Sequence, residues 1–375
     1  MSVPSPEGQP DIAADEHFRF KVILPAIVQG IIDKQDMPVN GGAFVALSPD
    51  RLKITLDTSL DSPLPANIDP TQLLLYNKKT PDFSPFVNVT LPEQHVDGTT
   101  DVTVKDQIVT VSNETELISW FSDVFDYPEV DLSIRGDPAI NLGKLKYDAH
   151  IDKTVKAKSL NKLQGFVIEQ LGLVMPPAEN GTNIEGTLNL PNWGSLTIGI
   201  GDLSLNLMSG DVRIGLITVY DVFIPPGNNS KYFNGQLFFD ALIQNFGTIL
   251  TNQGDALSDG NIQIDATGNA TVVDGQHINF VEAVLNKRRV SSTAPVTKLL
   301  GDVTGSITNS DVPISEMIGS VFGNSSFVED VLSHWNVTRG PEETKRSQPT
   351  LRKGINGRTA MNLFKMGMKL GVGKR

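Results

Sequence analysis

The sequence predicts a mainly β protein with two tandem antiparallel β-sandwiches, each carrying one amphipathic helix, plus a short helical C-terminal segment. The first observation is a series of short alternating runs, such as Leu52–Leu56 and Val102–Val104, separated by residues that form turns. The second is one strong helix pattern after residue 113, and the third is its return further along the chain. No strand–helix–strand alternation is present, which favours antiparallel sheets.

The first helix has a recognisable start. Asn113 precedes Glu116 by three residues, which is typical of a helix N-cap. The spacing of the following apolar residues places them on one helical face, and they are Leu117, Ile118, Phe121, Val124 and Phe125.

The same order of signals recurs about 125 to 130 residues later. The helical spacing returns at Leu242, Ile243, Phe246, Ile249 and Leu250, and the strand pattern 132–136 returns at 262–266. Upstream, 54–68 corresponds to 184–198 and 72–76 to 202–206. These offsets predict an internal duplication.

From these patterns we expect six segments along the chain. They are a disordered lead at 1–17, an apolar segment at 18–42, a first sandwich at 43–142, a second at 143–275, a helical segment at 276–337 and a basic, disordered tail at 338–375. The second sandwich is expected to open with the alternating stretch 144–158. Residues 360–370 could form a weak amphipathic helix on an anionic surface, or could simply be part of a solvated tail.

Composition excludes several classes of function. The 375 residues contain no cysteine, which rules out disulfides, thiolate metal sites and cysteine nucleophiles. Net charge is −12 although the tail holds ten basic and two acidic residues, so the body is strongly acidic and unsuited to nucleic acid. The longest apolar stretch, Val22–Ile32, is interrupted by Pro25 and Gln29 and is too short to cross a membrane.

The chain shows no pattern typical of an enzyme. Its five histidines lack metal-ligand spacing, and no nucleophile elbow or complete dinucleotide-binding motif is present, so we expect no catalytic residue, cofactor or metal. The pairs Asp123 with Asp126 and Asp255 with Asp259 could suggest calcium or glycoside chemistry, but solvated turn carboxylates are the better interpretation.

Glycosylation sequons are more frequent than composition alone predicts. Seven N-x-[ST] motifs occur, at Asn88, Asn113, Asn180, Asn228, Asn269, Asn324 and Asn336. If they carry glycans, the body of the protein enters the secretory pathway.

Several strings resemble a large uncharacterised family of fungal proteins. These strings lie within about residues 20–305 and are Val22–Asp33, Leu91–His95, Val111–Leu117, Ile151–Val155, Leu188–Pro191 and Asn269–Gly275. The resemblance implies a single-pass protein whose long β-rich domain lies on the lumenal side of the fungal vacuolar membrane. It also implies a fibronectin-like sandwich similar to the late-embryogenesis-abundant type 2 fold. The family's membrane span would lie just before Val22, where this chain is polar.

The resemblance leads to two hypotheses. The first is a noncatalytic lumenal domain that binds membrane lipid or a membrane-associated protein, and the second is a secreted or wall-associated spacer. The first predicts an apolar groove between sheet and helix, lined by Leu117, Phe121, Phe125, Leu242, Phe246 and Leu250, although these six could simply fill two cores. The sequence does not fix an oligomeric state.

Overall fold

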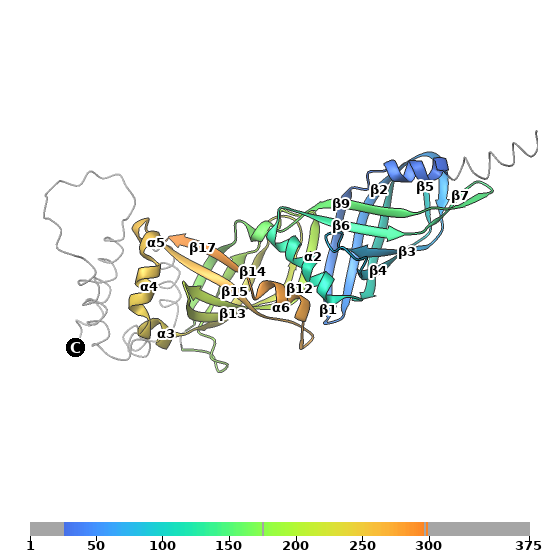
Figure 1. Cartoon of the computed structure of the whole chain (residues 1–375). Helices are drawn as coiled ribbons and strands as arrows, with labels where there is room; N and C mark the ends of the chain where they lie inside the picture. Colours follow the sequence, from blue (N-terminus) through green and yellow to red (C-terminus); the bar gives the residue numbers. More distant parts are fainter. Residues whose placement is uncertain (1–25, 175, 296–297, 299–375) are drawn as a thin grey trace, which may run out of the picture.

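A computed structural model describes residues 26–174, 176–295 and 298. The predicted lead at 1–17, the predicted tail at 338–375 and the part of the predicted helical segment from residue 299 to 337 lie outside the described residues. The described chain is elongated and mainly β, which confirms that part of the predicted fold class (Figure 1).

The first repeat comprises residues 39–158 and contains two sheets. Its strands are β1 (Val39–Ser48), β2 (Arg51–Ile68), β3 (Thr71–Tyr76), β4 (Pro85–Leu91), β5 (Gln94–Thr110), β6 (Glu129–Gly136), β7 (Ala139–Leu142), β8 (Leu145–Asp148) and β9 (Ile151–Lys158). Strand β2 pairs with β1 and β5, whereas the other sheet has the order β4–β3–β6–β9. Helix α2 (Glu114–Asp126) brings Trp120 against Phe44 of β1 and Phe86 of β4, with ring centroids 4.8 and 5.5 Å away.

The second repeat comprises residues 167–295 and pairs its strands in the same order. Its strands are β10 (Val167–Leu173), β11 (Ile184–Asn189), β12 (Leu196–Ser209), β13 (Val212–Ile224), β14 (Ser230–Leu237), β15 (Asn261–Val273), β16 (Gln276–His277) and β17 (Arg289–Pro295). Strand β11 pairs with β10 and β14, as β2 pairs with β1 and β5. The series β13–β12–β15–β17 matches β4–β3–β6–β9. The pairing therefore repeats as the sequence offsets predict.

The finer prediction of two separate fibronectin-like sandwiches is not confirmed. In the second repeat β13 also pairs with β14. This pairing joins the two series of strands into one sheet, whereas the corresponding strands of the first repeat form two sheets. The two end strands of that sheet, β10 and β17, lie close together: the Ile168 amide of β10 donates to Ser292 Oγ of β17 at 3.1 Å. A single sheet of 13 strands also runs through both repeats.

The predicted boundary at residue 143 is wrong. The hairpin formed by β7 and β8 pairs with β2, and β9 pairs along its whole length with β6, so both belong to the first repeat. A short 3-10 turn at Asn161–Leu163 then leads to β10. At the other end, the predicted helical segment 276–337 contains the helix α6 (Asn279–Leu285), but Gln276–His277 and Arg289–Pro295 are strands.

The single helix predicted in the second repeat is broken into three. They are α3 (Phe239–Gln244), α4 (Phe246–Asn252) and α5 (Gly254–Ser258). Gln253, at the last break, is buried, and its side chain donates to the carbonyl of Gln263 at 2.7 Å and accepts from its amide at 2.8 Å. The helix is interrupted at Gln253, where the side chain makes this contact with β15.

Strand β1 joins the two repeats. It pairs with β2 on one side and, in parallel, with the first residues of β12 on the other, with Gly42 opposite Leu196 and Val45 opposite Gly199. A Cβ atom on Gly42 would lie 2.7 Å from the Thr55 carbonyl, and one on Gly199 would lie 2.9 Å from the Val45 side chain. Glycine allows this close approach.

Helices α2 and α6 form a second contact between the repeats. Phe121 and Phe280 meet edge to face at 6.5 Å. Arg288, just after α6, binds both carboxylate oxygens of Asp126 at 3.0 and 2.6 Å. Asp126 ends α2, where the helix dipole disfavours an anion, so the guanidinium compensates an otherwise unfavourable charge.

Asp126→Asn is expected to lower the free energy of unfolding by about 1–2 kcal/mol, because it removes the negative charge and one of the two acceptor oxygens of a partly buried bidentate pair. Chemical denaturation measures the loss. Glu129→Gln is the matched control: Glu129 is 4.0 Å from Lys156 and both are exposed, so the change should stay below about 0.5 kcal/mol. Equal losses in the two variants would contradict this role of Arg288.

Candidate binding groove

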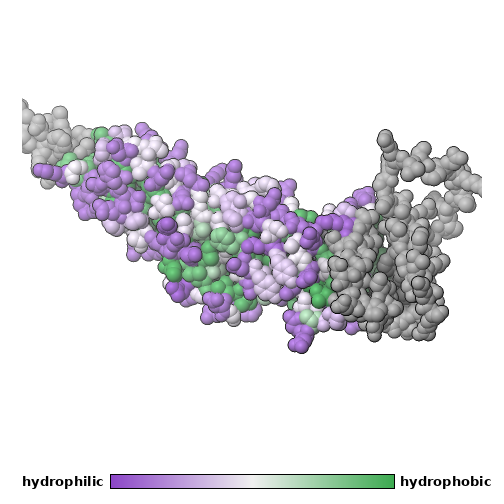
Figure 2. Space-filling view, turned by 180° about the vertical axis from the view of Figure 1, so that it is seen from behind, coloured by the Kyte–Doolittle hydropathy of each residue, from purple (hydrophilic) through white to green (hydrophobic). Residues whose placement is uncertain are grey.

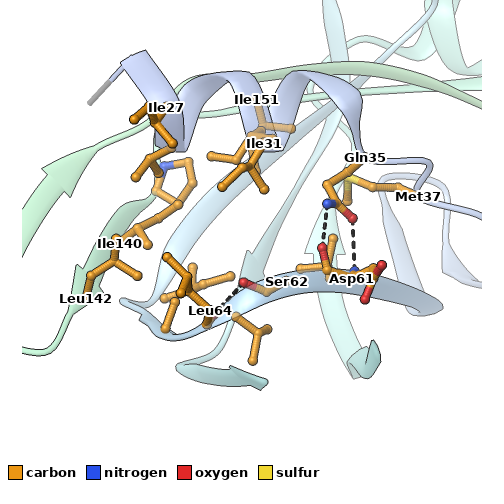
Figure 3. A pocket seen from close by; sticks show the side chains of 17 residues that line it. Ile27, Ile31, Gln35, Met37, Asp61, Ser62, Leu64, Ile140, Leu142 and Ile151 are labelled. Atoms are coloured by element: carbon orange, nitrogen blue, oxygen red, sulfur yellow. Dashed lines mark hydrogen bonds between the residues drawn. The ribbon is translucent and has the colours of Figure 1, made fainter. Parts of the chain in front are cut away.

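An apolar groove lies at the far end of the first repeat. Residues 26–34 form a helix that crosses strand β2 and the β7–β8 hairpin and covers a cavity of about 100 Å³ (Figure 3). The lining is almost entirely apolar; the helix contributes Ile27, Val28, Ile31 and Ile32, and the strands contribute Leu60, Leu64, Ala66, Ile68, Val96, Ile140, Leu142 and Ile151. The cavity can take a short length of an apolar chain.

The mouth of the groove exposes apolar side chains to water. Ile27 on the helix is 49% exposed and Leu64 on β2 is 51% exposed. Figure 3 shows the two on opposite sides of the opening, and Figure 2 shows hydrophobic residues among hydrophilic ones at this end of the molecule. Exposed apolar side chains that border a concave apolar surface are typical of a binding site.

An irregularity in β2 presents Leu64 at the mouth. The pairing of β2 with β5 shifts register between Ser62 and Ala66, a stretch that contains Pro63 and Pro65. Proline donates no ladder hydrogen bond, so regular pairing is interrupted here. Ser62 Oγ donates to the Leu64 carbonyl at 2.6 Å and fixes the displaced segment.

Two glutamines attach the helix to the strands beneath it. Gln29 donates to the His150 carbonyl at 2.7 Å and accepts from its amide at 2.9 Å. Gln35 treats Asp61 in the same way, at 2.5 and 2.9 Å (Figure 3). Each side-chain amide thus completes a backbone pair as a neighbouring strand would, and the helix is held at both ends.

A polar cleft adjoins the groove. It has a volume of about 310 Å³ and shares Gln35 and Met37 with the groove. Its charged residues come from the end of the helix and from β9, and they are Asp33, Lys34, Asp36, Lys153 and Lys156. The end of the first repeat therefore combines an apolar surface with a charged one.

Strand β9, which borders both cavities, is held by an ionic network. Asp152 accepts from Tyr76 Oη at 2.5 Å and from Arg135 at 2.7 Å. Burial favours the neutral carboxyl, but these hydrogen bonds outweigh it, and the pKa of Asp152 lies below its ordinary value. Burial and the hydrogen bond to Asp152 raise the pKa of Tyr76. Arg135 also stacks 3.9 Å from the centre of the Phe83 ring.

The six residues predicted to line a groove do not line this one. Leu117, Phe121 and Phe125 of α2 are 2–6% exposed and fill the core of the first repeat. Leu242, Phe246 and Leu250 are half-buried on α3 and α4. The groove is formed instead around 26–34, within the segment that the sequence marks as apolar. Gln29 and Gln35 carried no recognisable signal.

The described sequons occupy different environments. Exposed asparagines are Asn88, Asn180, Asn228 and Asn269. Asn113 is half-buried, accepts from the Glu116 amide at 3.1 Å as the predicted helix cap, and donates to Ser84 Oγ at 2.7 Å. Asn324 and Asn336 lie outside the described residues.

Two acidic residues considered for calcium or glycoside chemistry are paired with cations. Asp123 binds Lys79 at 2.7 Å, and Asp126 binds Arg288. Within residues 26–174, 176–295 and 298, no group of three or more His, Cys, Asp or Glu side chains is placed so that it could hold a metal ion. Among these same residues, no helix has the length and apolar character needed to cross a bilayer.

Residues 84–207 match the model of a family described as a protein of unknown function (DUF3712). No curated protein matches the chain. A protein from Archaeoglobus fulgidus is similar over 33% of this chain and 98% of its own, with 8% identity and a TM-score of 0.22. Escherichia coli alpha-2-macroglobulin activated by porcine elastase is similar over 70% of this chain and 22% of its own, with 10% identity and a TM-score of 0.16. The family match fits the resemblance to an uncharacterised family.

Replacing both Gln29 and Gln35 by methionine should loosen the helix over the groove. Four hydrogen bonds to the backbone of His150 and Asp61 are lost while side-chain volume is kept, so amide exchange in 26–34 should accelerate roughly tenfold or more. Hydrogen exchange read by mass spectrometry measures the change.

The matched control is Gln107→Met. Gln107 makes the same two-way contact with the backbone of Thr90, away from the groove. Exchange in 26–34 should be unchanged in this variant. Unaltered exchange in the double variant would contradict the attachment.

Proposed function

We propose that this protein is a noncatalytic, lipid-binding β-rod that acts at a membrane surface and holds an acyl chain in the groove. The observation that carries the proposal is the apolar groove with Ile27 and Leu64 half-exposed at its mouth. Each methylene withdrawn from water contributes about 0.8 kcal/mol. The small cavity suits part of a chain, with the remainder along the open side, and this favours reversible contact over permanent storage.

The titratable groups with shifted pKa values support a noncatalytic role. The pKa of Asp69 is lowered chiefly by its hydrogen bond to Lys146, which ties the turn between β2 and β3 to the β7–β8 hairpin. The raised pKa of Lys79 arises mainly from its hydrogen bond to Asp123. These groups, like Asp152, join neighbouring elements. Their shifts follow from structural pairing.

The resemblance further suggests a place on the lumenal face of the fungal vacuolar membrane, with a membrane-associated protein as an alternative partner. The repeated strand pairing supports the view that each repeat is a variant of the fibronectin-like sandwich. The continuous sheet, which would make a stiff rod, favours the second candidate: a secreted or wall-associated spacer. Glycosylation and location separate these roles from each other and from a cytosolic one.

The groove can be tested with decanol, a neutral ligand with a ten-carbon chain, titrated against the whole protein by calorimetry. Leu64→Asn should weaken binding about tenfold, because it replaces apolar contact at the mouth with an amide. Ile108→Asn is the matched control, since Ile108 is 55% exposed on β5 but does not line the groove. Absent binding, or equal loss in both variants, would overturn the proposal.

Peptide mapping of the protein from its native source, before and after removal of N-glycans, tests translocation. The exposed asparagines Asn88, Asn180, Asn228 and Asn269 should be occupied, whereas Asn113 should be bare because both ends of its amide are engaged. Bare asparagines throughout would count against any secretory location. Occupied sites combined with recovery from wall or medium would favour the spacer.

A further inference from the structure

We infer that the groove and the adjoining cleft together bind one acidic lipid, with its chain in the groove and its negatively charged head group in the cleft. This inference rests on the proposed function and names the class of ligand. The two cavities adjoin one another, since Gln35 and Met37 line both. An amphiphile is the ligand whose two parts match an apolar cavity beside a charged one.

Three lysines give the cleft its affinity for an anion. Lys34 is the last residue of the groove helix, whereas Lys153 and Lys156 come from β9. Lys153 is partly buried, and its ammonium donates to the carbonyl of Asp33, which fixes it at the cleft wall. Positive groups gathered in a concave surface attract anions more strongly than the same groups spread over an open surface.

The acidic residues nearby only partly cancel this charge. The carboxylate of Asp33 accepts a hydrogen bond at 2.8 Å from Gln29, which lies on the same helix and is not one of the cleft lysines. Glu129 lies 4.0 Å from Lys156, and both are exposed, so their pairing is weak. Asp36 is exposed at the cleft and opposes an anion. Removing the charge of Asp36 should therefore strengthen the binding of an anion, whereas removing a lysine charge should weaken it.

The border between the cavities suits the joint of an amphiphile. Gln35 is fixed there by its two hydrogen bonds to Asp61, so it marks where the polar cleft begins. Met37 is flexible and apolar, and it can cover the first methylenes of a chain. A head group in the cleft therefore directs its chain under the helix.

The test compares decyl phosphate, decanoate, decanol and inorganic phosphate, each below any critical micelle concentration, by calorimetry on the whole protein. We expect both acidic ligands to bind at least fivefold more tightly than decanol, and the advantage to shrink as salt rises. Combined Lys34→Gln, Lys153→Gln and Lys156→Gln should remove that advantage and leave decanol unaffected. Asp36→Asn should tighten the acidic ligands about twofold, and Lys105→Gln on β5 is the control.

The outcomes test the head-group site in the cleft separately from the groove. If decanol binds as tightly as decyl phosphate and decanoate, the head-group site is refuted while the groove remains. If inorganic phosphate binds as tightly as decyl phosphate, the cleft is an ion site and the single-lipid inference is refuted. If no ligand with a chain binds, the proposed function itself fails. Because Asp36→Asn alters an exposed side chain, its result stands even where the triple variant folds poorly.

Discussion

The backbone pairing of β1 is the interaction on which the rest of the structure depends. One edge of β1 pairs with β2 of the first repeat, and the other edge pairs with β12 of the second repeat. Gly42 and Gly199 permit the approach that this double pairing requires. The α2–α6 contact then closes the joint with Arg288 and Asp126. The relative position of the repeats is thus set by main-chain geometry, and side chains reinforce it.

The repeated strand order also indicates where the special features lie. Each repeat carries an insertion at the same point, between the third and fourth strands of the series β4–β3–β6–β9 or β13–β12–β15–β17. In the first repeat the insertion is the β7–β8 hairpin, which forms one wall of the groove. In the second it is β16 with α6, which packs against α2 (Figure 1). One shared strand order therefore carries a groove wall in the first repeat and a joint in the second.

Local signals were sufficient for part of this architecture. The cap at Asn113, the helix after it and the repeated strand order could be predicted, because each depends on neighbouring residues or on an internal comparison. The assignment of 151–158 failed because an alternating strand does not reveal its partner, which is β6. The groove was missed for the same reason, since Gln29 meets His150 across 121 residues. Gln253 interrupts a well-patterned helix through a contact with β15 that no periodicity shows.

The parallel pairing of β1 with β12 has a further consequence for solubility. A free strand edge is a template for pairing with another chain, and a protein of many strands carries that hazard at every unpaired edge. Here β1 and β12 cover part of one another, and β10 lies against β17 through Ser292. The two repeats together therefore leave less strand edge uncovered than two separate repeats would. A chain without disulfides gains protection against edge-to-edge aggregation from the way its repeats meet.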